Sequence, residues 1–450
     1  MQPLLWVRII IISKLIFIFD YFYFKPITLS LLAISSTLFF AESTDWQLLI
    51  IEALYYLTLT SFLNYRSKTN LKIEKMEEKQ SANFAKARQV HQNSLPDTLP
   101  TEDDISMAAF YQPAEELGGD YYNVFKVDHG SMNVFFDQYF IYMFDVSGHG
   151  IDSAMLAIFI NNTIEDYFKL QHEKGETVSP EKILSYIDKQ YRAEEYPGDY
   201  LVCLLVGVLD LNSYEFTYSS SGFQFPFYKL SPDGNLVELK TGGLPISSSV
   251  EQSFLELKET TIDFAKNEMM FFTTDGLLEQ TIDSGMYNNE LKEALKGIDY
   301  FHPAALVESI KNDFISFTGS QYGDDDITYL SIGRLAGESK EWEFAEENEE
   351  LINRQNKIIS YLHDSDIVNS HLINTLQDLT SLIWQKSHKL SVKTLVNEDY
   401  LMISLRGDKE EIEWNQFLEN NLDLTKLKEE GIQIFPCSKH CTKVYIFAKL

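Results

Sequence analysis

The most constraining feature of this chain is its first sixty residues, which are apolar enough to suit lipid better than water. Between Leu4 and Leu63 the sequence is dominated by Leu, Ile, Phe and Tyr. Lys25-Pro26 and the stretch 42–45 divide this region into three pieces, each short against the about 20 residues of a membrane-spanning helix. We therefore expect residues 1–63 to form a membrane anchor of two or three helices.

The charges around the apolar region predict its orientation. Basic residues follow the last apolar piece, namely Arg66, Lys68, Lys72 and Lys75. Because positive charge favours the cytoplasmic side, we expect the anchor in the inner (cytoplasmic) membrane and the rest of the chain in the cytoplasm. A cleaved signal peptide and a buried hydrophobic hairpin stay open as alternatives, although a signal peptide would have one apolar run and an early basic segment.

The composition of the remaining chain excludes one class of partner. The formal net charge is -30, and such a surface repels the phosphates of DNA and RNA, so we expect no nucleic-acid partner. The three cysteines, Cys203, Cys437 and Cys441, are too few and too uneven to form a disulfide framework. With 450 residues, 45% of them hydrophobic, the chain can bury more than one core.

Residues 64–100 are expected to form a connecting helix and linker. The stretch up to Leu95 is rich in Lys, Glu, Gln and Ala and lacks Gly and Pro, and Pro96 and Pro100 end it. Its apolar positions follow a heptad only loosely. A homodimeric coiled coil and a solvated spacer therefore both remain open.

Residues 101–335 are expected to form an α+β body. Short runs rich in β-branched and aromatic residues predict strands near 139–144, 200–209, 215–218 and 269–273. Ser231-Pro-Asp-Gly234 predicts a hairpin turn. Helices are expected to begin after Gly150, near Pro180 and near Pro303, because proline suits the first turn of a helix.

Residues 336–450 are expected to form a separate, small α+β domain. The acidic stretch 338–350 leads into two helices that end near 385, and strands follow near 390–396, 400–405 and 443–448. This order faintly resembles the histidine-kinase-like ATPase fold, but Arg406-Gly-Asp408 replaces the glycine motif that ATP binding needs. We therefore expect an interaction domain. Cys437, His440 and Cys441 lack the fourth ligand and the spacing of a zinc site.

Four motifs of the body each place an aspartate beside a glycine or at the end of a strand. They are Leu117-Gly-Gly-Asp-Tyr121, Asp145-Val-Ser-Gly-His-Gly150, Thr274-Asp-Gly276 and Gly323-Asp-Asp-Asp-Ile-Thr328. Glycine lets the backbone and a cation come close together. Several carboxylates that meet at one point repel each other unless a cation lies between them, and oxygen ligands of this kind prefer magnesium or manganese.

A pair of such ions suggests a particular chemistry. Two cations about 4 Å apart can share a bridging water, lower its pKa and direct the hydroxide at a phosphorus atom. The chain has no Cys-x5-Arg phosphate loop and no serine nucleophile elbow. The residues therefore favour direct hydrolysis of a phosphate ester without a covalent intermediate.

The four motifs, in this order, resemble those of the metal-dependent protein phosphatase (PPM) family. The resemblance covers Ile105 to Leu335 and is to the bacterial branch that controls sigma factors and sporulation, the SpoIIE/RsbU-like serine phosphatases. It implies a four-layer α-β-β-α sandwich that binds two divalent cations, Mn²⁺ or Mg²⁺. It also implies a protein serine/threonine phosphatase whose substrate is a phosphorylated regulatory protein of the anti-sigma-antagonist type.

The same resemblance implies roles for individual residues. Asp145 would bridge both cations, and the backbone carbonyl of Val146 would bind one of them. Asp120 would lie in or just behind this shell. Asp275 and Asp325 would complete the second site with Asp326 beside it, although the additional Asp324 leaves this register open by one residue. His149 would relay a proton to the leaving oxygen or merely pack, and Asp152 reads as a charge at the start of a helix.

One departure and two rival functions remain. The family usually has Asn-Ala-Gly-His where this chain has Ser220-Ser-Gly-Phe223, which puts substrate choice or rate in doubt but not metal binding. A catalytically silent receptor with a phosphatase fold is the main alternative, and the four retained aspartates argue against it. Gly118-Gly-Asp-Tyr-Tyr122 could also be taken for a diguanylate cyclase hairpin, but that reading leaves the other three motifs without a role.

Overall fold

The structure, a computed structural model, divides into two compact units, residues 1–86 and 87–450. The residues that it describes are 58–62, 64–73, 75–76, 88, 91, 94–96 and 99–100, followed by 104–450 with gaps at 116, 128–136, 149, 175–177, 283–284, 321, 336, 346–350, 365–368, 388, 397–398, 408–417, 419–421 and 437–442. In the first unit the described residues are helical, as expected for the start of the connecting helix.

The predicted anchor lies almost wholly outside the described residues, which begin at Thr58. Among the residues that are described, no helix combines the length and the apolar character needed to cross a bilayer. The number of spans expected for residues 1–63 therefore stays a prediction. Cys437, His440, Cys441 and Asp408 also lie outside the described residues.

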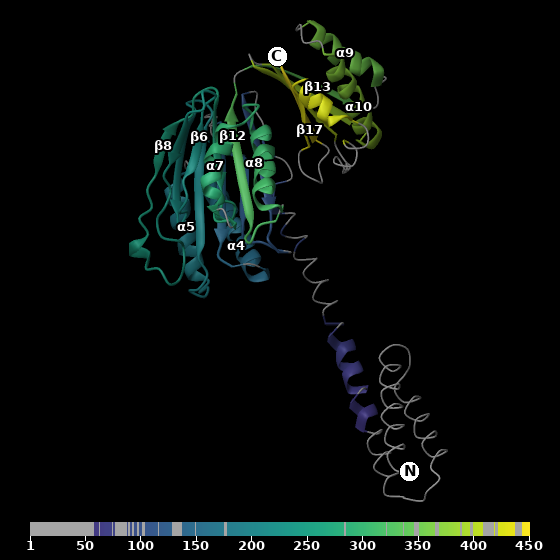
Figure 1. Cartoon of the computed structure of the whole chain (residues 1–450). Coiled ribbons are helices and arrows are strands. Elements are labelled where there is room, and N and C mark those ends of the chain that lie inside the picture. Colours follow the sequence, from purple (N-terminus) through teal and green to yellow (C-terminus); the bar gives the residue numbers. More distant parts are fainter. Residues whose placement is uncertain are drawn as a thin grey trace, which may run out of the picture. The chain divides into compact units, whose positions relative to one another are not determined.

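Two five-stranded antiparallel sheets form the middle of the body (Figure 1). The first sheet has the order β1 (Ile105–Gln112), β12 (Ile327–Arg334), β9 (Glu268–Thr273), β6 (Phe227–Leu230) and β7 (Leu236–Leu239). The second has the order β2 (Tyr121–Val127), β3 (Gln138–Val146), β4 (Val202–Asp210), β5 (Glu215–Ser221) and β8 (Thr260–Asp263). Phe216 of the second sheet packs against Phe227 and Phe272 of the first, in the core between the sheets.

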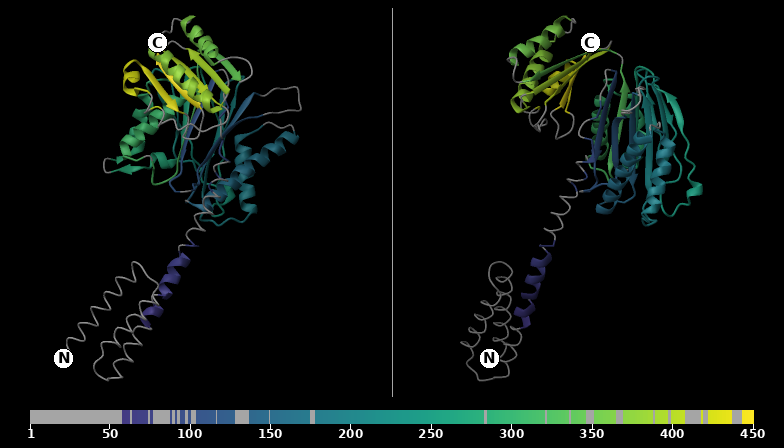
Figure 2. Two further views of the ribbon diagram at one scale, coloured as in Figure 1. Left: turned by 90° about the vertical axis from the view of Figure 1, so that its right-hand side faces the viewer. Right: turned by 180° about the vertical axis from the view of Figure 1, so that it is seen from behind.

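Helices cover the outer face of each sheet (Figure 1; Figure 2). α4 (Ile151–Lys174) and α5 (Pro180–Ala193) share a core with β2, β3 and β4. α7 (Tyr287–Lys296) and α8 (Pro303–Thr318) share another with β6, β9 and β12. The expected α+β fold is confirmed, and its layers follow the order helix, sheet, sheet, helix.

Local sequence explains where these helices start. The Ser179 side chain accepts a hydrogen bond from the backbone N–H of Lys182, and Pro180 occupies the first helical turn of α5. His302 caps α8 in the same manner through Ala304 N–H, with Pro303 behind it. The predicted turn at Ser231–Gly234 joins β6 to β7, with Gly234 at a φ of 80°. These starts and this turn are confirmed.

The tail forms a third five-stranded antiparallel sheet. Its order is β13 (Glu338–Ala345), β14 (Lys389–Val396), β15 (Tyr400–Arg406), β17 (Lys443–Lys449) and β16 (Ile432–Pro436). Helices α9 (Leu351–Asp364) and α10 (Ser370–Ser387) pack on one face of the sheet, and the short α12 (Leu424–Glu429) precedes β16. The two long helices and the three expected strands are confirmed.

The acidic stretch 338–350 was expected to lead into the tail, and its first half is itself a strand of the tail sheet. Residues 338–345 form β13, which pairs with β14 so that Trp342 lies opposite Val392 and Phe344 opposite Leu390. Aromatic and glutamate residues alternate here, which is the period of a half-buried strand. The acidic composition hid this alternation.

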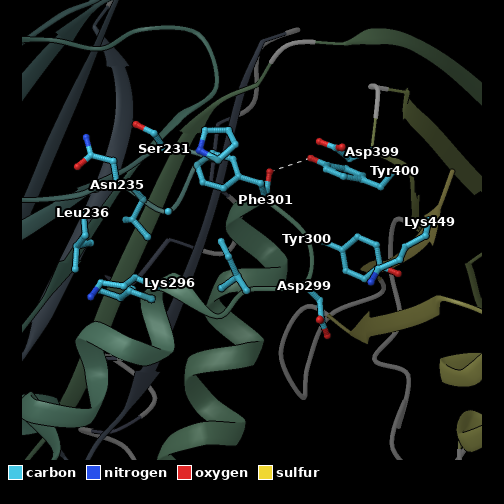
Figure 3. A pocket seen from close by; sticks show the side chains of 15 residues that line it. Ser231, Asn235, Leu236, Lys296, Asp299, Tyr300, Phe301, Asp399, Tyr400 and Lys449 are labelled. Atoms are coloured by element: carbon cyan, nitrogen blue, oxygen red, sulfur yellow. Dashed lines mark hydrogen bonds between the residues drawn. The ribbon is translucent and has the colours of Figure 1, made fainter.

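The other face of the tail sheet packs against the body, so the two share one compact unit. Tyr300 and Ala304 of the body share a buried cluster with Tyr400, Tyr445 and Phe447 of the tail. The Tyr400 hydroxyl donates to the carbonyl of Phe301 at 2.9 Å, beside a cavity of about 330 Å³ (Figure 3). The tail is therefore continuous with the body in packing, although its strands form their own sheet.

Candidate active site

The four aspartate motifs lie at the same end of the two sheets. Asp120 immediately precedes β2, and Asp145 is the second-last residue of β3. Asp275 follows β9 as the first residue of α6 (Asp275–Leu278), and Asp326 immediately precedes β12. Tyr121 pairs with Phe144 in one sheet and Thr273 with Tyr329 in the other. Antiparallel pairing therefore brings residues far apart in sequence to neighbouring strand ends.

Asp120 immediately precedes a strand of the second sheet, but a hydrogen bond holds it to a residue that follows a strand of the first. Thr274 Oγ1 donates to Asp120 Oδ2 at 2.7 Å and accepts from the backbone N–H of Thr328 at 3.2 Å. Asp120 is only 1% exposed. One hydroxyl thus joins the strand ends of both sheets and orients a buried carboxylate.

Asp326 clamps the loop that leads to Asp120. Its Oδ1 accepts from Ala114 N–H at 2.8 Å, and its Oδ2 accepts from Gly119 N–H at 2.6 Å. A Cβ on Gly118 would lie 2.3 Å from Oδ2 of Asp326. The carboxylate therefore serves the backbone of the loop, and the motif needs glycine at 118 because no side chain fits there.

Close backbone approach also explains two other glycines of the motifs. A Cβ on Gly119 would lie 2.3 Å from the carbonyl oxygen of Val146, and one on Gly276 would lie 2.0 Å from the carbonyl oxygen of Asp326. The carbonyl of Val146, which the resemblance assigns to a cation, thus lies beside the chain next to Asp120. Neither contact would survive a larger residue without movement of the backbone.

Burial and mutual repulsion raise the pKa values of the clustered aspartates. Burial, and then the charges of Asp145 and Asp326, raise the pKa of Asp120 well above its usual range. Burial, and then the charges of Asp275, Asp325 and Asp326, do the same to the pKa of Asp145. The pKa of Asp275 is raised by burial and by Asp325. Asp145 is therefore the centre of the cluster, because its charge acts on Asp120 and the charges of Asp275 and Asp325 act on it.

The structure separates Asp325 from Asp324. Asp325 is near enough to Asp145 and Asp275 to raise the pKa of both. Asp324 and Asp325 are both exposed, but Asp324 is held by Gln280, which donates to its Oδ2 at 3.0 Å and accepts from its backbone N–H at 2.9 Å. Asp325, and not Asp324, is thus among the charges that act on Asp145 and Asp275.

The donors of this cluster suit a pair of hard cations. They are carboxylate oxygens and a backbone carbonyl, which is the ligand chemistry of magnesium and manganese. Within the described part of the chain, no three His, Cys, Asp or Glu side chains are grouped tightly enough to hold an ion as they stand. The fit therefore rests on the kind of donor and on repulsion between buried carboxylates, which bound cations would relieve.

Comparison with known proteins places this body in a family. Residues 137–335 match the family model described as stage II sporulation protein E, SpoIIE. This matched segment of the body is of the SpoIIE type, a PP2C-type serine phosphatase domain. It contains Asp145, Asp275 and Asp325, whereas Asp120 lies before it.

Two curated proteins similar to this chain are named phosphoserine phosphatases. Over 250 residues it is 24% identical to phosphoserine phosphatase RsbU of Bacillus subtilis (strain 168), a match that covers 55% of this chain and 69% of RsbU. Over 206 residues it is 22% identical to phosphoserine phosphatase RsbP of the same organism, covering 45% of this chain and 46% of RsbP. The chain thus spans about half the length of RsbP.

A solved structure of the RsbU and RsbW domains of a Mycobacterium tuberculosis protein is also similar. Its TM-score is 0.44, and it is 17% identical over 79% of this chain and 95% of the solved chain.

Of the other residues singled out from the sequence, His149 is not described, and the described ones lie outside the aspartate cluster. The proton-relay role of His149 therefore stays a prediction. Asp152 lies in the first turn of α4, where Tyr200 donates to it at 3.4 Å. Ser220 and Ser221 donate to the carbonyls of Gly242 and Leu244. The two serines of the Ser220-Ser-Gly-Phe223 motif thus hold a neighbouring loop.

Sequence reasoning missed the supporting residues Thr274 and Gln280, and it gave Asp326 no task of its own. Thr274 sits inside a quoted motif, directly before Asp275, so its position was available but its contact with Asp120, 154 residues away, was not. Gln280 carries no signal in the sequence. Its role depends on a loop contact that only the fold reveals.

Proposed function

We propose that this chain is a membrane-anchored, metal-dependent phosphatase that removes phosphate from serine or threonine of a regulatory protein of the anti-sigma-antagonist type. The observation that carries the proposal is that the four aspartate motifs meet at one end of the two sheets, where the charge of Asp145 raises the pKa of Asp120 and the charges of Asp275 and Asp325 raise the pKa of Asp145. The match of residues 137–335 to the SpoIIE family model, and the similarity to phosphoserine phosphatase RsbU, support a phosphoserine substrate.

Two sets of donors would hold two divalent cations. Asp120, Asp145 and the carbonyl of Val146 would hold one, and Asp145, Asp275 and Asp325 would hold the other. When bound, such cations neutralise the oxygens of a phosphate group and make an attacking water more acidic. We propose manganese or magnesium, since both prefer oxygen donors of this kind.

Two further residues of the protein position the proposed metal ligands and take no part in the reaction themselves. Thr274 fixes the orientation of Asp120, and Asp326 holds the loop 114–120 through backbone N–H groups. Such preorganisation fixes the carboxylates before a substrate arrives.

A covalent route through the nearby cysteine is disfavoured. Cys203 pairs with Asp145 across β3 and β4, and burial together with the charges of Asp145, Asp275 and Asp120 raises the pKa of its thiol to about 12. The thiol is therefore protonated near neutral pH, and only the thiolate is a strong nucleophile. Direct attack by water on the phosphorus atom is the route that these residues favour.

The test of this function compares two aspartate variants of the full chain in detergent. With manganese, the wild type should hydrolyse para-nitrophenyl phosphate and a phosphoserine peptide, and Asp145→Asn should lose at least about 100-fold in kcat/KM, as expected when a group that acts on the transition state is removed. Asp152→Asn is the matched control, because Asp152 lies outside the cluster, and it should stay within a few-fold of the wild type. Turnover that persists in a chelator, or full activity of Asp145→Asn, would refute the proposal.

The membrane anchor is part of the same proposal, and it is supported by the apolar residues between Leu4 and Leu63. The full chain should stay with the membrane fraction after an alkaline carbonate wash, whereas a chain that starts at Asn64 should appear in the soluble fraction. Release of the full chain by the wash would argue for a peripheral protein.

A further inference from the structure

The end of the connecting helix docks on the body next to the aspartate cluster. Arg88, His91 and Ser94 are helical, and His91 is 2% exposed. The His91 ring lies 6.0 Å from the ring of Tyr111 and 6.2 Å from that of Tyr121, edge-on to the latter at 88°. Leu95 packs against both the core under α4 and α5 and the core between the sheets.

One hydrogen bond ties this segment to β2. The Tyr121 hydroxyl donates to the backbone carbonyl of Ser94, and the Ser94 hydroxyl donates to the carbonyl of His91 at 2.6 Å. Tyr121 is the first residue of β2 and directly follows Asp120. The docked segment therefore holds the residue next to a predicted metal ligand.

The Tyr121 ring also reaches the neighbouring strand. It is fully buried and stacks on Phe144 with 5.2 Å between ring centroids and 11° between planes. Phe144 directly precedes Asp145, just as Tyr121 follows Asp120. Since successive side chains of a strand point to opposite faces, the two rings lie behind the two carboxylates. The position of Tyr121 is thereby linked to both.

Tyr111 provides a second contact between the helix end and the cluster. Its ring touches His91, and its hydroxyl is near enough to Asp326 and Asp120 for their charges, after burial, to raise its pKa. The helix end thus meets two tyrosines, and each is close to the aspartates.

The docked segment buries a polar atom of the His91 ring. His91 Nε2 is buried and has no hydrogen-bond partner among the described residues, and burial lowers the pKa of the ring to about 4. A buried polar atom without a partner weakens the packing around it. A contact of this kind can be released more easily than the two cores that flank it.

We propose that the docked segment, of which His91, Ser94 and Leu95 are described, is a positioning element for the proposed metal ligand Asp120, which it holds through the hydrogen bond from Tyr121 to the Ser94 carbonyl. When the segment is docked, Asp120 is fixed for cation binding. When it is released, the site binds its cation more weakly. This inference rests on the proposed metal-dependent function.

The test measures manganese binding as well as activity, with the full chain in detergent. Tyr121→Phe keeps the ring stack and removes only the hydroxyl. It should weaken manganese binding about threefold to tenfold, the equilibrium factor of one hydrogen bond, both in calorimetric titration and in the manganese concentration for half-maximal activity. The kcat at saturating manganese should stay within about twofold of the wild type, because the ligands themselves are unchanged.

A neighbouring tyrosine is the matched control. The Tyr142 ring lies 6.1 Å from that of Tyr121, and its hydroxyl donates to Asn161 at 2.5 Å and not to the docked segment. Tyr142→Phe should lower stability without changing manganese binding. If Tyr121→Phe binds manganese like the wild type, or if both variants weaken binding equally, the positioning role is wrong.

A second variant covers the case in which Tyr121→Phe does not fold. Leu95→Ala loosens the docked segment but leaves Tyr121 whole, and it should weaken manganese binding in the same direction. Unchanged binding in Leu95→Ala would equally overturn the inference. Failure of the proposed function itself would look different, because the wild type would then show neither manganese binding nor manganese-dependent hydrolysis.

Discussion

Replacement of Gly276 by alanine tests whether close backbone contact assembles the aspartate cluster. Gly276 follows Asp275 in α6, and its added Cβ would lie 2.0 Å from the carbonyl oxygen of Asp326, where an ordinary contact begins near 3.4 Å. The two aspartate-bearing segments must then separate by more than roughly 1 Å, and a displacement of that size can cost about 100-fold in rate.

Gly276→Ala should therefore lose about 100-fold in kcat/KM for para-nitrophenyl phosphate in saturating manganese. The overpacked contact should also lower the free energy of unfolding by about 1–3 kcal/mol, measured by urea denaturation. Both effects share one cause, because the same steric contact separates Asp275 from Asp325 and strains the fold.

Gly297→Ala is the matched control for this substitution. Gly297 caps α7 at a φ of -91°, and its added Cβ would meet nothing closer than 3.4 Å. It should retain activity within about twofold and stability within about 0.5 kcal/mol. If Gly276→Ala behaves like this control, the backbone contact does not set the geometry of the site and the reasoning fails.

Three further predictions concern the charges of the site and the packing of the tail. Because the folded protein raises the pKa of Asp120, the metal-free fold should lose stability as the pH rises from below 4 through that raised pKa. Asp120→Asn should reduce this loss of stability and should also reduce the rise in Tm that manganese causes. A pH profile of stability that is the same in Asp120→Asn and the wild type would contradict the assignment. Asp325→Ala should abolish manganese-dependent hydrolysis, whereas Asp324→Ala should keep it within a few-fold, and the reverse result in the same assay would move the ligand by one residue. Phe447→Ala should destabilise the 87–450 unit by about 3–5 kcal/mol in chemical denaturation, and a loss below about 1 kcal/mol would show that the tail contributes little to the packing.

The catalytic body could be anticipated because its signals are local. Proline at 180 and 303 marked the starts of two helices, and the fold uses the glycines beside Asp120 and Asp275 for close approach. The sequence left the choice between Asp324 and Asp325 open, because three identical residues in a row carry no internal marker. The hydrogen bonds of Gln280 to Asp324, and the charge of Asp325 acting on Asp145 and Asp275, distinguish the two residues.

The relation of the tail to the body could not be anticipated in this way. The contact between tail and body depends on aromatic residues such as Tyr300 and Phe447, which are 147 positions apart. The sequence does not distinguish an aromatic residue that packs within its own domain from one that packs against a neighbouring domain. The strand β13 was hidden by its glutamates for a related reason. Only the assembled sheet determines which face of a strand is buried. In the sequence of an acidic edge strand, the buried face is visible only as an alternation of glutamate with aromatic residues.

The tail meets the body at the end of β1 and β12 that is farther from the aspartates. His302 contacts Ser106 near the start of β1 and packs against Tyr445 and Phe447, whereas Gln112, at the other end of the strand, lies opposite Ile327 beside Asp326. A strand of this length covers about 25 Å. The tail contact and the aspartate cluster therefore lie at opposite ends of one strand, so a substitution in either can be made without touching the other.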